Sequence, residues 1–281
     1  MLTNRNRWKQ LVERVKTIPE HPVLTSCLVL VVLALLVVGL SYSYYVEDYY
    51  NFVGQVLAEA HGMLFDIAVI GILIYWLNEN GQKRMRIRTY LDEIEDFRLW
   101  ESEESAFRTA GNIKRLNRHH KYKLDLVNCY LARTNLNGVI LKESNLNTAN
   151  VTHSNLIQCN LENARMNQTN FQDSNLNQAN LSRSYASGAI FTNTFLIKSN
   201  FEGSFLIKAD FENALLTEAN LRGSVLMGAN LKNANLLKAD LRGAEGLTVE
   251  QLLEAKTLQN ALLDDQLYQQ IMERSPKLIA T

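Results

Sequence analysis

The chain has 281 residues, of which 47% are hydrophobic, and its 29 Lys and Arg residues are balanced by 29 Asp and Glu residues. This neutral balance provides no general attraction to nucleic acid or another polyanion. Three cysteines, Cys27, Cys129 and Cys159, form no Cys-x-x-Cys motif and cannot all pair, so the sequence indicates neither a disulfide framework nor a thiolate zinc site.

The first apolar segment runs from Val23 to Leu40 and contains no charged residue. Its length approaches the ~20 residues that an α-helix needs to cross a bilayer, so a transmembrane helix is predicted at 23–42, after a cytoplasmic segment at 1–22. A cleavable signal peptide is the alternative. It is disfavoured because the apolar stretch exceeds the usual ~7–15 residues and no Ala-x-Ala cleavage site follows it.

A second apolar run extends from Met63 to Leu77, and it can be lengthened toward the N-terminus as a tilted helix. A second transmembrane helix is therefore predicted at 60–78, with residues 43–59 as an extracytoplasmic loop. Asp66 lies inside this run, where an ionisable side chain is a candidate functional site, for example on an ion path. A carboxylate that reaches the interface or packs between helices is the alternative.

Charges on either side of the two apolar segments predict their orientation. The connecting loop carries only Glu47, Asp48 and Glu59. Basic residues precede the first segment and follow the second: Arg5, Arg7, Lys9, Arg14, Lys16, Lys83, Arg84, Arg86 and Arg88. Because positive flanks stay in the cytoplasm, both termini are predicted to be cytoplasmic.

Residues 82–122 are predicted to form an amphipathic helical neck. No proline occurs from Gln82 to Lys121, and apolar residues from Ile87 to Phe97 recur at three- and four-residue spacing. The apolar face of this neck could lie on the membrane surface, on another copy, or over the end of the next domain as an N-terminal cap.

A five-residue period governs the chain from residue 123 to 246. Stepping by five from Leu126 to Leu241 gives 24 positions, and all but Ala186 hold a large apolar residue. Two residues before each of these positions stands a small residue such as Ala, Ser, Thr or Cys, with Val139 the only bulky one after the first. Neither a helix nor a simple strand has this period, so a repeat architecture is indicated.

These units resemble the A(D/N)LXX motif of pentapeptide repeat proteins, as in "LNTAN", "LENAR", "LNQAN" and "LKNAN". The resemblance is to the membrane-anchored bacterial type and implies a mainly β fold, a right-handed quadrilateral β-helix in which four units make one coil. The 24 units would give about six coils. It also implies that the large residue and the small residue two before it point inward, and that Asn160, Asn180, Asn200 and Asn220 stack as an amide ladder.

Two departures from regular repetition are expected at and beyond the repeats. Ala186 replaces a large inward residue, so a local distortion of the coil is predicted there. Residues 247–281 are predicted to be a C-terminal helical cap and tail, because Thr248 and Gln251 fit a capping box and nearby leucines can cover the end of the core.

Several large apolar residues occupy positions that the five-residue frame directs outward. In steps of 20 residues they fall on two opposite faces, mostly in the C-terminal half of the repeats. Exposed apolar patches of this kind usually mark interfaces, although scattered outward apolar residues are also common. The candidate interaction residues are Tyr185, Phe205, Ile207, Val225 and Met227 on one face and Phe195, Ile197, Leu215 and Leu237 on the other.

The leading functional prediction is a non-catalytic scaffold, tethered in a bacterial inner membrane or a thylakoid membrane, that presents its repeats to a protein partner or to itself as a homo-oligomer. No catalytic motif, cofactor or metal site is recognised. A subunit of an oligomeric transport or signalling assembly is the alternative. A DNA mimic that regulates topoisomerase, a role known in the family, is disfavoured because residues 123–246 hold 10 acidic and 11 basic residues; no nucleic-acid partner is predicted.

Overall fold

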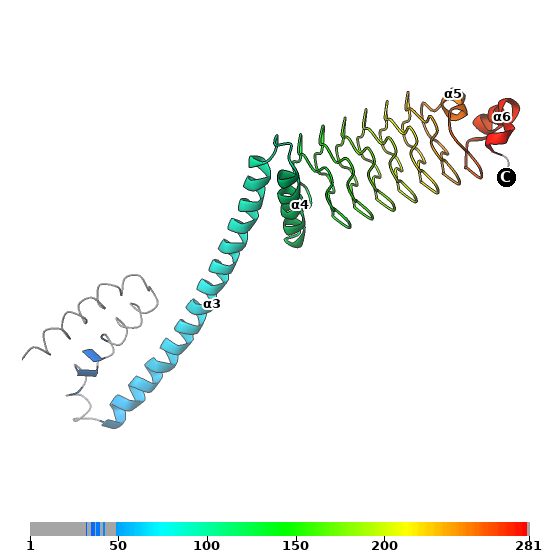
Figure 1. The fold of residues 1–281 in the computed structure, drawn as a ribbon. Coiled ribbons are helices and arrows are strands. Elements are labelled where there is room, and N and C mark those ends of the chain that lie inside the picture. The colour runs from blue at the N-terminus through cyan, green and yellow to red at the C-terminus, as the bar shows by residue number, and fades with distance from the viewer. Residues whose placement is uncertain (1–31, 33–34, 37, 40–41, 43–48, 280–281) are drawn as a thin grey trace, which may run out of the picture. The chain divides into compact units, whose positions relative to one another are not determined.

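The computed structural model describes residues 32, 35, 36, 38, 39 and 42 and then the continuous stretch 49–279 (Figure 1). The predicted cytoplasmic segment 1–22, and nearly all of the predicted first transmembrane helix at 23–42, lie outside the described residues. The chain divides into two units at Asn80 and Gly81, and the second unit contains the repeats.

Helix α3 spans Tyr49–Asp96 and contains an apolar window with a mean hydropathy of 1.8. By length and composition alone, α3 could cross a membrane. It includes the second apolar run, and it also begins earlier than the predicted span, so residues 49–59 of the predicted loop are helical.

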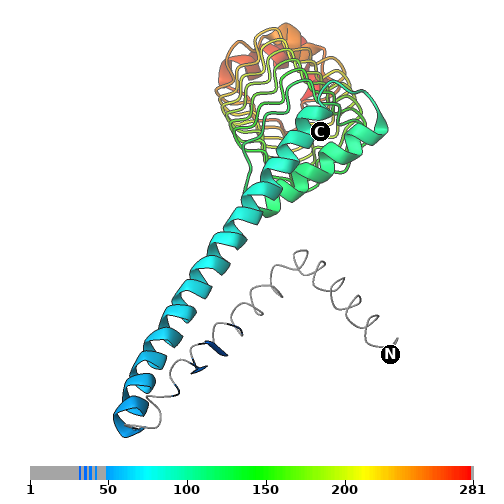
Figure 2. The same ribbon diagram turned by 90° about the vertical axis from the view of Figure 1, so that its left-hand side faces the viewer.

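The neck consists of two helices. After α3 ends at Asp96, the chain turns and α4 spans Glu103–Arg118. Ser102 starts α4 with a capping box, in which its hydroxyl accepts from the backbone N–H of Ser105 at 3.1 Å. Buried Ile94, Ile113 and Leu116 join the core of the repeats, so the neck covers the first coil; Figure 2 shows α4 beside the near end of the coils.

Residues from 125 onward form coils whose register is 20 residues. Parallel bridges join each fifth residue to the residue 20 positions later, from Asp125 with Asn145 to Val225 with Glu245. Among the described residues these contacts are isolated bridges, and none extends into a strand. Hydrogen bonds such as Leu126 N–H to Asn145 O, at 2.7 Å, connect successive coils. Four five-residue units therefore occupy one coil, as predicted, while the total of six coils stays a prediction.

A tight turn follows every inward residue. In the first unit the N–H of Cys129 donates to Leu126 O at 3.1 Å, and Asn128 between them has φ of 56°. The equivalent position in every unit up to Gly243 has a positive φ, and only six of these residues are Gly. A left-handed third residue is the mark of a type II turn, and it explains why Asn and Gly recur there.

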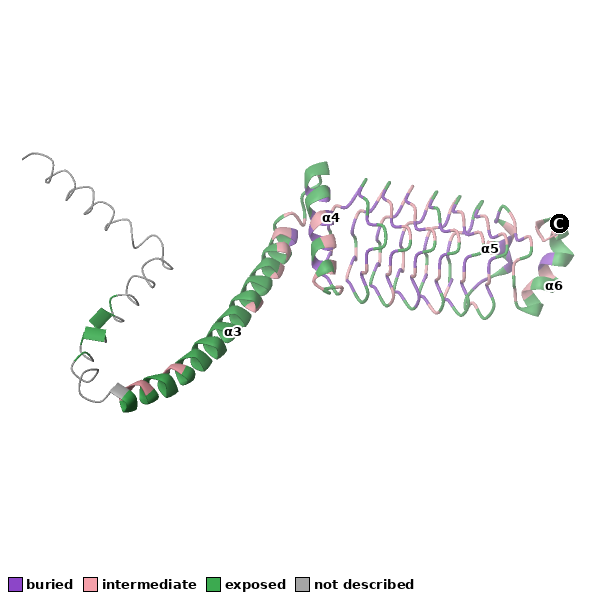
Figure 3. Ribbon diagram, turned by 90° about the horizontal axis from the view of Figure 1, so that it is seen from below, coloured by how far each residue is buried: buried purple, intermediate pink, exposed green. Residues whose placement is uncertain are grey.

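The solenoid is the stack of coils formed by residues 125–245, and buried positions recur along every coil (Figure 3). Large and small residues alternate at these buried positions. The predicted distortion at Ala186 is absent. Ala186 is fully buried, its N–H donates to Phe205 O at 2.8 Å, and Tyr185 stays outside. Two large rings share this coil with Ala186, because Phe191 and Phe201 lie edge to face with ring centroids 5.6 Å apart.

The C-terminal cap combines short helices with a further repeat unit. Helix α5 spans Val249–Leu253 and starts with the predicted capping box of Thr248 and Gln251. The chain then returns to the ladder, where Thr257 pairs with Asn235 and the left-handed Asn260 (φ 56°) follows buried Leu258. Helix α6 at Asp265–Arg274 and the 3-10 helix η2 at Pro276–Leu278 complete the end.

Candidate interaction surfaces

One face of the solenoid carries a column of outward apolar residues, of which Ile207 and Val225 are half-buried. It is called the Tyr185 column: Tyr185, Phe205, Ile207, Val225 and Met227. Bridges place Tyr185, Phe205 and Val225 on successive coils. The rings of Tyr185 and Phe205 stack with centroids 5.0 Å apart and an interplanar angle of 1°. Their exposed fractions are 46% and 39%, and that of Met227 is 58%. The five predicted residues are thus brought together on one outward surface.

The opposite face carries the Phe195 column: Phe195, Ile197, Leu215 and Leu237. Phe195 bridges to Leu215 on the next coil and is 44% exposed, while Ile197, Leu215 and Leu237 are half-buried. All nine predicted interaction residues therefore point outward, in two separate groups. Their role in binding stays a prediction.

The turns do not require these apolar residues. At most equivalent positions an Asn or Asp accepts a hydrogen bond from the N–H two residues later, as Asn200 does from Glu202 at 3.1 Å. This contact closes a local turn and leaves the side chain oriented by the backbone. Phe205 and Val225 have no acceptor atom and cannot make it. The columns therefore interrupt the polar pattern of the solenoid at sites where the fold itself favours Asn.

Polar columns on the other two faces show the contrast. Asn220 donates to Asn200 at 3.1 Å and Asn200 to Asn180 at 3.4 Å, which confirms that part of the predicted amide ladder. Beside this ladder, Lys142 lies 2.6 Å from Glu162, and this hydrogen bond holds the pKa of Glu162 below its ordinary value. These faces offer solvated, internally paired groups rather than an apolar surface.

Asp66, the predicted intramembrane polar site, lies in α3 and is exposed. Nothing in its surroundings assigns it a function, so an ion path stays a prediction. Among the residues that the structure describes, no three His, Cys, Asp or Glu side chains gather in a group that could hold a metal ion.

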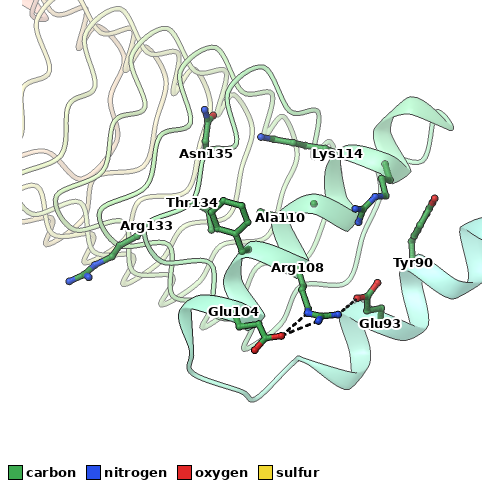
Figure 4. Close-up of a pocket in the computed structure, with 12 residues that line it drawn as sticks. Tyr90, Glu93, Glu104, Arg108, Ala110, Lys114, Arg133, Thr134 and Asn135 are labelled. Atoms are coloured by element: carbon green, nitrogen blue, oxygen red, sulfur yellow. Dashed lines mark hydrogen bonds and ion pairs between the residues drawn. The ribbon is translucent and has the colours of Figure 1, made fainter.

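Sequence reasoning missed a hollow of about 900 Å³ between the neck and the first coils (Figure 4). Arg108 on α4 connects the two helices that line the hollow. The Arg108 guanidinium lies 3.4 Å from Glu93 on α3 and 3.0 Å from Glu104 on α4. The guanidinium of Arg115 stacks over the ring of Tyr90 at 5.6 Å. Arg133 of the first coils lies 3.0 Å from Glu103 of α4, so the hollow lies at the joint between the neck and the solenoid.

A second missed residue, Arg98, fastens the neck to the first coil. It donates from Nη1 to Val127 O at 2.6 Å and pairs with Glu95 at 2.6 Å, and its side chain is 16% exposed. The hydrogen bond holds the pKa of Glu95 below its ordinary value. The sequence gives only a weak signal for this role, namely an arginine directly after the last turn of a helix.

Comparison with known proteins identifies the repeat segment. The profile described as "Pentapeptide repeats" matches residues 125–163, 164–203 and 209–245, with eight copies. The solenoid is similar to pentapeptide-repeat domains. This match implies a right-handed quadrilateral β-helix, and the 20-residue register with four turns per coil agrees with that fold.

Solved structures also resemble this chain, and two of the three described next are pentapeptide repeat proteins. The plasmid-mediated fluoroquinolone resistance protein QnrB1 is 18% identical with a TM-score of 0.42, and the match covers 57% of this chain and 88% of QnrB1. A thylakoid-lumen protein of Arabidopsis thaliana is 25% identical with a TM-score of 0.29, covering 37% and 70%. HetL of Nostoc sp. strain PCC 7120, involved in regulating heterocyst differentiation, is 21% identical with a TM-score of 0.23, covering 54% and 93%. No curated protein matched.

Proposed function

We propose that the protein is a non-catalytic, membrane-tethered scaffold that binds protein through the outward columns of its pentapeptide-repeat domain on the cytoplasmic side. The observation that carries this proposal is the exposed ring stack of Tyr185 and Phe205, which continues into Val225 and Met227. Aromatic residues in an exposed apolar group are typical of interface centres.

The tether is supported by α3. Its apolar window is long enough to cross a bilayer, and basic residues follow this run from Lys83 onward. A tethered domain with an apolar side surface would meet its partners at the membrane, where anchoring raises their effective concentration.

Two measurements test the two parts of the proposal. Alkaline carbonate should leave the full chain in the membrane fraction, because apolar spans that cross a bilayer are not extracted with peripheral proteins. Extraction of the unmodified chain by carbonate would contradict the tether.

The scaffold part is tested by a photo-crosslinking amino acid placed at Phe205 of the full chain in cells. The expected result is a protein adduct of defined mass. The matched control is the same amino acid at Asn170, a half-buried polar bridge position on a neighbouring face, which should give none. Equal adducts from both positions, or none from Phe205 and from Phe195, would overturn the scaffold.

A further inference from the structure

The two apolar columns differ in what borders them. Five of the six glycines in the left-handed turn position stand at the edges of the face with the Tyr185 column: Gly188, Gly203, Gly223, Gly228 and Gly243. The corresponding edges of the Phe195 face carry Asn193, Asn213 and Asn233 on one side and Lys198, Glu218 and Lys238 on the other.

Because glycine has no side chain, little projects from the edges on either side of the Tyr185 column. The two long side chains there, Arg183 and Lys208, run along the edge, with their methylene groups over Gly203 and Gly228. On the Phe195 face, by contrast, Lys198 and Glu218 form an ion pair of 3.5 Å across successive coils. The Tyr185 face is therefore the one of the two that another flat protein surface can approach closely.

The bridge residues on this face carry a cation at one end of the column and an anion at the other. The face is therefore complementary to a second copy of itself that is turned end to end. Successive coils present Arg165, Tyr185, Phe205, Val225 and Glu245. Arg165 and Glu245 each lie two coils from Phe205, or about 10 Å at the ~4.8 Å spacing of neighbouring strands. Both are exposed, and neither forms an ion pair with any residue in the described part of the chain.

We propose that two copies of the chain pair antiparallel through the Tyr185 column, related by a two-fold axis at the level of Phe205. This inference rests on the proposed scaffold function and names a second copy as the partner. The axis brings Phe205 of each copy together, places Tyr185 against Val225 of the second copy, and pairs Arg165 with Glu245 twice. Such a self-complementary surface is what an isologous dimer requires.

The other charges on the face decide between orientations. A parallel pair would put Arg165 against Arg165 and Glu245 against Glu245, and like charges in contact are unfavourable. In the antiparallel pair, Arg183 faces Gly223 of the second copy, one coil from its Glu245. Lys208 meets its own counterpart, but at the edge, where a flexible ammonium can reach water. The surplus of cations on the face makes an acidic protein of another kind the competing occupant.

Disulfide crosslinking of the full chain in its membrane tests the geometry. In a Cys27→Ser background the remaining Cys129 and Cys159 are buried, so a cysteine introduced at Phe205 should report the pair. Phe205→Cys is expected to give a covalent dimer. Phe195→Cys is the matched control on the opposite face and should give none. Absence of the dimer with Phe205→Cys, or an equal yield with Phe195→Cys, would overturn self-pairing.

Charge reversal tests the orientation. Arg165→Glu and Glu245→Arg should each lower the yield of the Phe205→Cys dimer by about tenfold or more, because each variant places like charges together twice. The double variant restores both pairs with reversed sign and should recover the yield. Failure of the double variant to recover it would overturn the antiparallel arrangement.

The photo-crosslinking result at Phe205 separates this inference from the scaffold function. An adduct with twice the mass of the chain supports self-pairing. An adduct with a different protein leaves the scaffold standing and overturns self-pairing. The absence of an adduct at Phe205 overturns self-pairing, and its absence at Phe195 as well defeats the scaffold.

Discussion

At the scale of single residues, the small inward position must satisfy packing and hydrogen bonding together. Buried Ser174 does both, because its hydroxyl donates to Val151 O at 2.7 Å and accepts from the N–H of Ser154 at 3.0 Å. Ser184 occupies the equivalent position on the opposite column and is equally buried. Its Oγ is the one buried side-chain polar atom without a hydrogen-bond partner among the described residues.

Because Ser174 is hydrogen-bonded and Ser184 is not, replacing each serine by alanine should change the free energy of unfolding differently at the two sites. Ser184→Ala should leave the free energy of unfolding unchanged or raise it by about 1 kcal/mol, because it removes an unpaired buried hydroxyl. Ser174→Ala, the matched control, should lower it by about 1–3 kcal/mol because it leaves partners unsatisfied. Denaturant unfolding of both variants measures the two values, and a loss at Ser184 as large as at Ser174 would contradict the assignment.

At the scale of the coil, core volume is conserved across neighbouring units rather than within each unit. Phe171, Phe191 and Phe211 stack along one column, with successive centroids 5.2 and 4.9 Å apart. Ala186 lies in the unit directly before Phe191, in the coil with the missing large side chain. The same coil holds Phe201 where the coils before and after it hold Leu181 and Leu221, so Phe201 supplies the volume that Ala186 lacks, and the backbone ladder continues without a bulge.

A pair of substitutions tests this exchange of volume. Ala186→Leu alone should overpack the coil and lower the free energy of unfolding by about 1–3 kcal/mol. Adding Phe201→Leu to Ala186→Leu should cost less than the sum of the two single substitutions, because space at one site is then used by the other. A double-mutant cycle from chemical denaturation gives the coupling. Strict additivity would mean that the two sites are packed independently.

At the scale of the whole molecule, the solenoid and its two caps form one buried core. Residues from Ile94 in the neck to Ile271 in α6 belong to it, together with Cys129 and Cys159. Burial raises the pKa of the Cys129 thiol to about 11 and that of the Cys159 thiol to about 12. In the unfolded chain a thiol titrates near ~8.5, so the folded protein holds these two protons more tightly.

This linkage predicts a loss of stability in alkali. The thiols contribute their full stabilising effect below about pH 8.5, and the effect is lost as the pH rises toward the raised pKa values. Near pH 10 each thiol should lower the free energy of unfolding by about 2 kcal/mol. Cys129→Ala with Cys159→Ala should flatten this pH dependence, measured by denaturant unfolding from pH 7 to 10. An unchanged slope would show that other groups cause it.

The sequence by itself determined the features that repeat locally. The five-residue period gives the inward ladder, the turn positions and the outward columns, because each unit folds through the same short-range turn. The apolar run of α3 and the capping box of Thr248 were readable for the same reason.

Only the tertiary structure decided the features that depend on contacts between distant residues. It divided the neck at Asp96, joined Arg98 to Val127, returned Leu258 to the ladder, and placed Phe201 in the same coil as Ala186. These outcomes depend on how helices and coils pack across many residues of chain, and no local pattern specifies that packing. The glycines that border the Tyr185 face likewise could be recognised as its edges only after the 20-residue register placed them beside it.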